Sequence, residues 1–443
     1  MRELVLTPDL RQCSVGQTTS SRRHQKELEL DIGVAEFAED VRVFLEKNAA
    51  RTANGAARSW GRGSDEVAIF RRERYARGGP EMTAAREWQR TRFENGFGWI
   101  TGPAAFGGRE LSRVHEMAYD ELESEYTVPD ISDLRIVGLS LVGPTLLAHG
   151  TQEQLELFLR PLYRGDLVAC QLFSEPGAGS DLAGLRTRAE RVDDGWVVNG
   201  QKVWTSVAHC ADIGELLCRT DSHAPKHDGI TAFLVDMDSP GMDVRPLRQM
   251  TGGAEFNEVF FTDVHIPDSR RLGPVGAGWK VAMTTLLNER STVGSDESIS
   301  AESALNIGWL TSLLDAVGKR RDPVARRRLA ELYVARSTTD SLNARMLRTL
   351  ASGGTAGPEA SVAKLMNTAN VTAAADFVSE VLGAQLIADN GDWGTFAWNE
   401  LLLSTPALRL LGGTDEIMKN ILAERVLGLP REAAPQSRSN DRR

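Results

Sequence analysis

Cysteine is scarce in this sequence of 443 residues, which contains only Cys13, Cys170, Cys210 and Cys218. Their spacing is not that of a paired metal site, and their density is far below that of a disulfide scaffold. No metal site is therefore predicted. The opening residues also lack an apolar stretch of signal-peptide length. Together these absences predict a protein of a reducing compartment, the cytoplasm.

Long apolar runs and an excess of positive charge are missing as well. No run approaches the roughly 20 residues that a membrane helix needs, so no membrane span is predicted. The 51 Lys and Arg residues are outnumbered by 61 Asp and Glu, which gives a formal net charge of -10. Nucleic-acid binders neutralise phosphates with clustered basic residues, and this balance argues against one. Small-molecule or protein partners are expected instead.

Apolar residues recur with a different period in different parts of the chain. The helical spacing predicts helices over residues 28–46, 83–97, 114–126, 134–149, 152–163, 298–317, 323–350, 358–382 and 416–426. In the middle of the chain the period falls towards two, which predicts strands over residues 230–235 and 259–266 and a hairpin turn at Asp193-Asp194.

This order predicts an α+β multidomain protein, in which an N-terminal α-helical domain precedes a middle antiparallel β-domain and a C-terminal helical bundle. The predicted boundaries are a flexible tail over 1–27, the helical domain over 28–165, the β-domain over 166–275, the bundle over 276–430 and a second tail over 431–443.

Residues 51–79 contain seven arginines among glycines, without helical or strand periodicity. We interpret this stretch as a solvated surface insertion. The alternative is that some of these arginines bind the phosphates of a substrate.

The most informative motif is the turn Ser174-Glu-Pro-Gly-Ala-Gly-Ser-Asp181, which lies between two strand-like runs and is followed by Trp204 and Ser206. A flavin needs backbone and hydroxyl donors at its polar edge and an aromatic wall against its face. These residue types are present here. The alternative is that the motif is only a tight turn and that Trp204 is a core residue.

The turn resembles the flavin-binding signature of the acyl-CoA dehydrogenase family, and residues 411–430 resemble the C-terminal signature of the same family. The resemblance covers residues 28–430 and implies the three-part fold described above. It also implies FAD as cofactor, an acyl-CoA as substrate and an electron-transfer flavoprotein as electron acceptor.

The resemblance assigns a cofactor-binding role to Phe173, Ser174, Gly179, Ser180, Trp204, Ser206, Thr414 and Glu416. It also places Ser180 near the entering thioester. Two positions depart from the family pattern. Ser174 stands where relatives often have Thr, which keeps the hydroxyl, and Glu416 stands where Gln is common, which adds an acceptor near the cofactor's phosphates.

The catalytic base must be a carboxylate, because the reaction removes a weakly acidic α-proton while a hydride leaves the β-carbon. Many relatives carry this Glu where Gly412 stands here. A second family arrangement puts the Glu before an Arg on the first long helix of the C-terminal domain, which matches Glu289 and Arg290. The resemblance therefore implies that Glu289 is the base and that Arg290 binds the acyl-CoA.

Helical geometry places Glu289 at the edge of an apolar stripe formed by Trp279, Ala282, Leu286 and Val293. The alternative is an ordinary structural Glu-Arg ion pair. His149, His209 and His265 are interpreted as structural residues.

The segments with which relatives complete the flavin site across a subunit interface are absent from residues 291–308 and 380–384. A homodimer or homotetramer with other contacts, or a mixed oligomer with a sister subunit, is expected. Two further functions stay open: a flavin oxidase or monooxygenase with the same fold, and a non-catalytic subunit.

Overall fold

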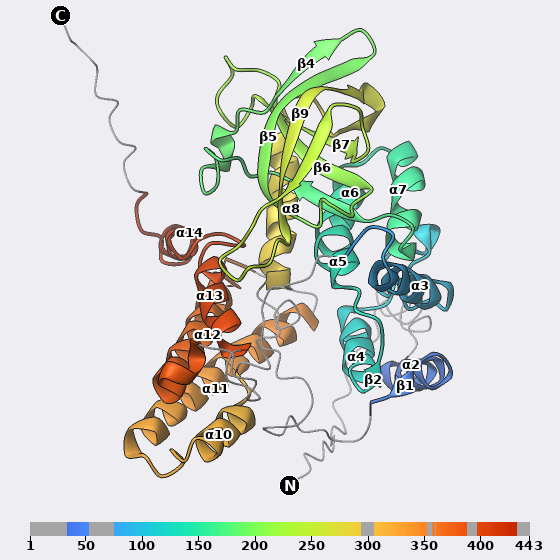
Figure 1. Ribbon diagram of the computed structural model, residues 1–443. Coiled ribbons are helices and arrows are strands. Elements are labelled where there is room, and N and C mark those ends of the chain that lie inside the picture. The colour runs from blue at the N-terminus through green and yellow to red at the C-terminus, as the bar shows by residue number, and fades with distance from the viewer. Residues whose placement is uncertain are drawn as a thin grey trace, which may run out of the picture.

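The chain runs through helices, then strands, then helices in the computed structural model (Figure 1), as predicted. The structure describes residues 33–52, 75–293, 305–351, 357–358, 360–387 and 397–431, apart from a few side chains inside helices. The predicted tails fall outside these ranges except for Arg431, and so does most of the arginine-rich stretch.

Six helical segments account for most of the N-terminal region: α2 (Val34–Asn48), α3 (Pro80–Glu94), α4 (Arg113–Glu123), the π-helical segment η2 (Arg135–Val142), α6 (Gly143–His149) and α7 (Gln152–Arg164). Phe37, Val41, Phe44 and Leu45 form the buried face of α2, at the spacing that predicted the helix. The predicted helix over 134–149 is instead a π-helical segment that continues into α6. Pi-helical turns of this kind are frequent at functional sites.

An eight-stranded sheet forms the middle region, with β3 (Ala169–Leu172), β4 (Arg188–Val192), β5 (Gly195–Ser206), β6 (Ile213–Arg219), β7 (Ile230–Asp236), β8 (Met242–Pro246), β9 (Phe256–Pro267) and β10 (Arg271–Leu272). The strand order is β10-β7-β6-β4-β5-β9-β8, and β3 pairs with β6. Val192 pairs with Gly195, which confirms the predicted hairpin at Asp193-Asp194. Both predicted strands are confirmed as parts of β7 and β9.

The antiparallel description needs correction at β6, which pairs in parallel with β4 at Arg188 and Arg219 and in parallel with β3. The longer of these parallel pairings joins β3 and β6. The β4-β5 hairpin separates these two strands in sequence, and a connection of this length permits the parallel return that a tight turn does not.

The C-terminal region contains α8 (Gly278–Val293), α10 (Ile307–Ala316), α11 (Pro323–Ala351), α12 (Ala360–Leu382), α13 (Ala397–Leu408) and α14 (Asp415–Ile421), after which a π-helical turn covers Leu422–Val426. The predictions over 323–350, 358–382 and 416–426 are confirmed to within two residues, whereas α13 was missed. The helix predicted from residue 298 is described only as α10.

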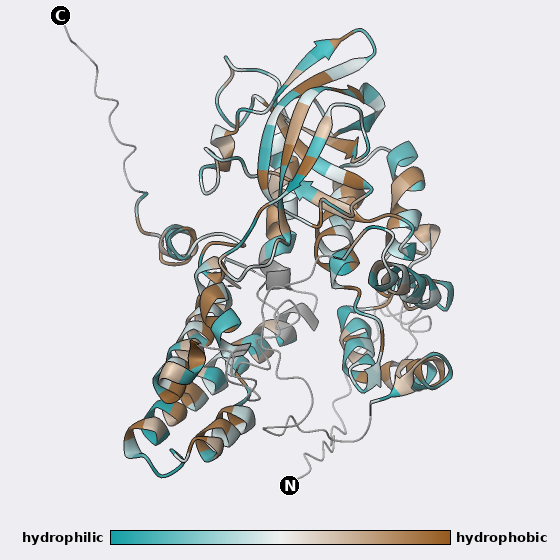
Figure 2. Ribbon diagram, in the orientation of Figure 1, coloured by the Kyte–Doolittle hydropathy of each residue, from teal (hydrophilic) through white to brown (hydrophobic). Residues whose placement is uncertain are grey.

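Three hydrophobic clusters hold these regions together. One lies between the N-terminal helices and one face of the sheet, and a second packs η2, α6, α7 and α8 on the other face. The third fills the bundle of α10 to α13. Figure 2 shows apolar residues concentrated along the central strands and inside this bundle. No helix in the described part of the chain is long and apolar enough to cross a membrane.

Candidate active site

The Ser174–Asp181 turn is held by hydrogen bonds within its own backbone, and part of it is exposed to solvent. The backbone N–H groups of Glu175 and Ala178 each donate to the other residue's carbonyl at 3.0 Å. Gly179 and Ser180 are exposed. A Cβ added at Gly177 or Gly179 would meet nothing within 4 Å, so backbone at this turn is accessible to a ligand.

A buried ion pair anchors this turn from below. The Lys202 ammonium is fully buried and donates to Glu175 Oε1 at 2.8 Å and to the Phe173 carbonyl at 2.9 Å. The Glu175 carboxylate also accepts from the backbone N–H groups of Arg186, at 2.7 Å, and Thr187, at 2.9 Å. Burial alone would raise the pKa of Glu175, but Lys202 and these donors hold the pKa below its ordinary value.

Sequence reasoning missed this pair. The available signal was a lone lysine at a strand position flanked by Val203 and followed by the motif's Trp204, with a glutamate inside the turn itself.

Trp204 lies on a strained bulge of β5. The register between β5 and β9 shifts between Lys202 and Thr205, and Trp204 and Val207 have positive φ angles of 61° and 66°. Such angles are uncommon for non-glycine residues, and for a β-branched valine they are true outliers. The Trp204 side chain is 58% exposed and meets Phe256 edge-on at 5.9 Å between ring centroids. It is therefore not a core residue, and its face is available to a planar ligand.

The turn and the bulge are joined directly. The Val203 N–H donates to the Ser174 carbonyl at 2.9 Å. This bond brings Phe173, Ser174, Trp204 and Ser206 onto two adjacent segments, with Phe173 buried and the two serines half-buried. Lys226 additionally pairs with Asp181 at 2.5 Å at the far end of the turn.

The two residues predicted from the C-terminal signature lie on a different element. Thr414 caps α14, and its hydroxyl accepts from the Ile417 N–H at 3.2 Å, while Glu416 is exposed. Asp415 between them is buried and pairs with Arg409 at 2.8 Å and Lys364 at 3.3 Å. Because α14 packs mainly on α12, Thr414 and Glu416 belong to the bundle and not to the sheet.

Glu289 lies on the buried face of α8. Val281, Ala282 and Thr285 are fully buried on that face, Leu286 is partly buried, and Glu289 follows one turn after Thr285 as a half-buried residue. The predicted stripe is thus found at Ala282, Leu286 and Trp279. The side chains of Arg290 and Val293 fall outside the described residues.

Gly412, the position at which the sequence resemblance led us to look for a base, has a φ of 64°. This left-handed backbone favours glycine and disfavours a side chain such as glutamate. The chain therefore has a backbone reason, as well as a sequence reason, for lacking a carboxylate there.

Beneath α8, a second glutamate was missed by sequence reasoning. Glu215 on β6 is fully buried, and its Oε1 lies 2.8 Å from the Thr285 hydroxyl oxygen. Burial raises the pKa of Glu215 to about 8, although the hydrogen bond from Thr285 opposes the rise. The signal was a single carboxylate inside the otherwise apolar run Ile213–Cys218.

The three histidines have the partners expected of structural residues. His149 Nε2 lies 2.7 Å from the Thr284 hydroxyl, His265 Nε2 lies 3.0 Å from Asp194, and His209 Nδ1 lies 3.3 Å from the Asn257 amide nitrogen. Arg77, from the edge of the arginine-rich stretch, also has a structural role: it pairs with Asp212 and Asp238, each at 2.6 Å.

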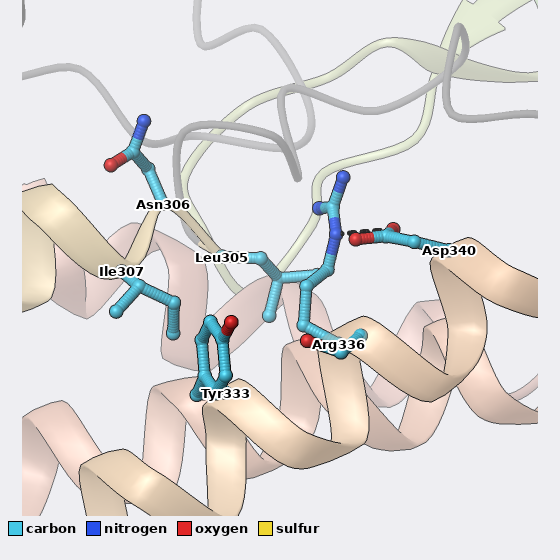
Figure 3. Close-up of a pocket in the computed structure, with 7 residues that line it drawn as sticks. Leu305, Asn306, Ile307, Tyr333, Arg336 and Asp340 are labelled. Carbon is cyan, nitrogen blue, oxygen red and sulfur yellow. Dashed lines mark hydrogen bonds and ion pairs between the residues drawn. The ribbon is translucent and has the colours of Figure 1, made fainter. Parts of the chain in front are cut away.

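A hollow of about 270 Å³ lies between α10 and α11, lined by Leu305, Asn306, Ile307, Tyr333, Arg336, Ser337 and Asp340. Figure 3 shows Tyr333 and the ion-paired Arg336 and Asp340 along one wall. These helices carry none of the predicted site residues.

Comparison with known proteins decides the family. Residues 170–264 match the model of the acyl-CoA dehydrogenase middle domain, and residues 276–427 match that of the acyl-CoA dehydrogenase C-terminal domain. The chain is also 36% identical over 410 residues to the acyl-CoA dehydrogenase IpdE1 of Mycobacterium tuberculosis (strain ATCC 25618 / H37Rv), covering 90% of this chain and 99% of that protein. The chain belongs to the acyl-CoA dehydrogenase family.

Two further relatives refine this family placement. Acyl-CoA dehydrogenase FadE34 of the same organism is 41% identical over 332 residues, which cover 74% of this chain but only 44% of FadE34. Among solved structures, one described as "Tcur3481-Tcur3483 steroid ACAD" is 27% identical with a TM-score of 0.72, covering 90% of this chain and 98% of that one.

As an acyl-CoA dehydrogenase, the chain is an oxidoreductase that acts on CH–CH bonds, and its family is generally FAD-dependent. The structure brings together the middle-domain residues predicted for the cofactor. It leaves Thr414 and Glu416 on a separate element of the C-terminal bundle.

Proposed function

We propose that this acyl-CoA dehydrogenase uses FAD to convert an acyl-CoA thioester to its 2,3-enoyl form, with Glu289 as the base. The α C–H bond breaks and its proton passes to the Glu289 carboxylate. The β C–H bond breaks as a hydride leaves, and the double bond forms between the two carbons. FAD, when bound, supplies the hydride acceptor, and an electron-transfer flavoprotein then takes the two electrons.

The residues of the turn and the bulge fit a flavin. Accessible backbone at Gly177 and Gly179 and the hydroxyls of Ser174 and Ser180 are donors of the type its polar edge requires. The exposed, strained Trp204 offers an aromatic face beside them. Thr414 and Glu416 would hold the cofactor's linker from another copy or subunit, because α14 packs away from the sheet.

The position of Glu289 carries the proposal for the base. It is a half-buried carboxylate at the end of an apolar helix face, where partial removal of water strengthens a carboxylate as a base. Gly412 cannot serve, since it has no side chain. Arg290, the next residue, is proposed to bind the acyl-CoA.

Replacing Glu289 by Gln keeps the size of the side chain and removes its basicity. We expect the rate of flavin reduction by substrate to fall by about 10²–10⁴-fold, the usual contribution of a general base. Glu153→Gln, at an exposed position on α7 outside the predicted site, is the matched control and should keep the wild-type reduction rate. A Glu289→Gln variant that retains full FAD content and full activity would remove Glu289 from the mechanism.

We further propose a polycyclic, steroid-derived acyl-CoA as the substrate class. Support comes from two solved relatives, one described as a steroid ACAD and one as a variant of it, at TM-scores of 0.72 and 0.71. The test is the anaerobic visible spectrum of the holoenzyme with CoA esters ranging from short branched to polycyclic. Bleaching by the polycyclic esters supports the proposal, and bleaching only by short esters contradicts it.

Rapid reoxidation of the bleached enzyme in air would instead favour an oxidase or monooxygenase.

A mixed oligomer is the second proposal, which would also accommodate a non-catalytic role for this chain. One solved relative is described as the ChsE4-ChsE5 complex, and the steroid enzymes are described by two chain names. The measurement is the mass and FAD content of the chain purified alone and with a co-expressed sister subunit. A homodimer or homotetramer with one FAD per chain, active alone, would contradict the mixed assembly.

The cytoplasm stays the predicted compartment, on the basis of low cysteine usage.

A further inference from the structure

Glu215 is the least expected charged residue of the fold, because it stands in the middle of a central strand with no exposed surface. Its neighbours on the same sheet face, Ile213 and Leu217, both belong to the hydrophobic cluster that α8 covers. A glutamate at such a position is costly unless it is neutral or fully paired. Glu215 also contacts α8, the helix that carries Glu289, so the presence of a buried carboxyl group at this position needs an explanation.

A chain of hydroxyl contacts connects Glu215 to the elements around it. Glu215 Oε1 lies 2.8 Å from Thr285 Oγ1, which lies 2.9 Å from Thr145 Oγ1 on α6. The Thr145 hydroxyl donates in turn to the Leu141 carbonyl at 2.8 Å, within the π-helical segment η2. The chain therefore spans β6, α8, α6 and η2, all of which pack together in this cluster.

The number of protons available for these hydroxyl contacts distinguishes the ionised form of Glu215 from the protonated form. Each threonine has one hydroxyl proton, and the Thr145 hydroxyl has two acceptors within reach, the Leu141 carbonyl at 2.8 Å and Thr285 Oγ1 at 2.9 Å. If Glu215 is ionised, Thr285 donates to it, and the single proton of Thr145 must serve both the Leu141 carbonyl and Thr285, so one of the three contacts lacks its own proton. If Glu215 is protonated on Oε1, it donates to Thr285, Thr285 donates to Thr145, and all three contacts are hydrogen bonds.

The other carboxyl oxygen points to the same form. Glu215 Oε2 is buried and has no hydrogen-bond partner among the described residues. An unpartnered carbonyl oxygen of a neutral acid costs less than an unpartnered oxygen of a carboxylate.

We propose that Glu215 is a positioning residue, which as a neutral carboxylic acid donates to Thr285 and so fixes the turn of α8 that precedes Glu289. This inference rests on the proposed role of Glu289. Thr285 and Glu289 are four residues apart and therefore lie on the same side of α8. A helix held at this turn by a directional chain of bonds keeps the base at a constant distance from the substrate's α-carbon.

The charged and titratable groups on the elements packed here are few. They are Lys280, Glu289 and Arg290 on α8, Arg135 at the start of η2, His149 at the end of α6, Asp236 at the end of β7, Cys170 on β3, and Cys218 and Arg219 on β6 itself. Lys280 and Asp236 are exposed, and Cys218 belongs to the cluster on the opposite sheet face.

Four variants of the FAD-loaded enzyme test the proposal. Thr285→Val removes the hydroxyl and keeps the shape, whereas Thr285→Ser keeps the hydroxyl. Glu215→Gln keeps a neutral donor, and Glu215→Leu removes it. Because misplacement of a catalytic group by about 1 Å can cost on the order of 10²-fold, we expect Thr285→Val and Glu215→Leu to slow flavin reduction at saturating substrate by roughly tenfold or more. KM should change far less, and Thr285→Ser and Glu215→Gln should keep near wild-type rates.

Infrared spectroscopy gives a readout that needs no substrate. The holoenzyme at pH 7 should show a carbonyl band of a protonated carboxyl group that Glu215→Gln lacks. Absence of this band, wild-type rates in Thr285→Val, or a loss in Glu215→Gln as large as in Glu289→Gln would each overturn the proposal. Failure of the proposed function is recognised separately, because then no acyl-CoA bleaches the wild type or Glu289→Gln stays active.

Discussion

Glu175 and Glu215 are both buried beside the candidate active site, yet their surroundings favour opposite charge states. Glu175 faces an ammonium group and two backbone donors, which together outweigh the cost of burial. Among the described residues, Glu215 has one hydroxyl as its partner, and burial dominates. The comparison teaches that burial alone does not set the charge of a carboxyl group, since the number of donors around it decides the outcome.

The largest effect is expected from removing the cation beside Glu175. Lys202→Met leaves an uncompensated carboxylate under the Ser174–Asp181 turn, which should lower the free energy of unfolding by about 3–5 kcal/mol. Urea unfolding of the FAD-loaded protein measures this change. The double variant Lys202→Met with Glu175→Gln should lose much less, and equal losses in the single and double variants would show that the pair is not ionised.

Opposite pH dependences should follow from the two charge states. The pKa of Glu175 is lowered in the fold, so the stability that it adds relative to Glu175→Gln is present at neutral pH and is lost as pH falls through that pKa. The pKa of Glu215 is raised to about 8, so the wild type should lose stability relative to Glu215→Gln as pH rises towards that value. Between the ordinary pKa of a glutamate and the raised pKa of Glu215, each pH unit lowers the free energy of unfolding by at most about 1.4 kcal/mol. Unfolding curves between about pH 3 and about 8.5 measure both trends, because the Glu175 trend lies below the ordinary glutamate pKa and the Glu215 trend lies above it; parallel trends would contradict the comparison.

Asp415 extends the comparison to a third buried carboxylate. It has two cationic partners, Lys364 and Arg409, so the loss of one leaves the other in place. Lys364→Met should therefore cost less than Lys202→Met, about 1.5–3 kcal/mol. Thermal unfolding of the two variants in parallel tests this order, and a larger loss for Lys364→Met would reverse it.

The smallest effect is expected at an exposed ion pair. Arg320 and Asp315 lie 2.9 Å apart, but both side chains are more than half exposed. Arg320→Gln should change the free energy of unfolding by no more than about 0.5 kcal/mol. The same unfolding assay serves, and a loss comparable to that of Lys202→Met would mean that burial is not what distinguishes these pairs.

Sequence patterns predicted the elements that have one apolar face. The stripe of α2 and the Asp193-Asp194 hairpin are direct consequences of periods 3.6 and 2. The parallel pairing of β3 with β6 was not predicted, because a period of two is the same for both strand directions. The π-helical form of η2 also escaped, since its apolar residues recur much as in an α-helix.

The site shows the same division. The motif located Ser174, Ser180 and Trp204 on adjacent segments. The buried side chains that pack behind these segments belong to no sequence motif. Glu215 and Thr285 lie 70 residues apart and meet only because α8 packs across β6. Isolated charges inside apolar runs, as at Lys202 and Glu215, are the one signal of such supports that a single sequence offers.

The most direct test of Glu289 separates proton removal from hydride transfer. A 3-thia acyl-CoA carries sulfur in place of the β-carbon, so its α-proton can leave while no hydride can. Incubation with the holoenzyme in D2O, followed by mass spectrometry, measures exchange at the α-carbon. We predict exchange with the wild type and none above the solution rate with Glu289→Gln at equal ligand occupancy. Equal exchange by both proteins would contradict the assignment of Glu289 as the base.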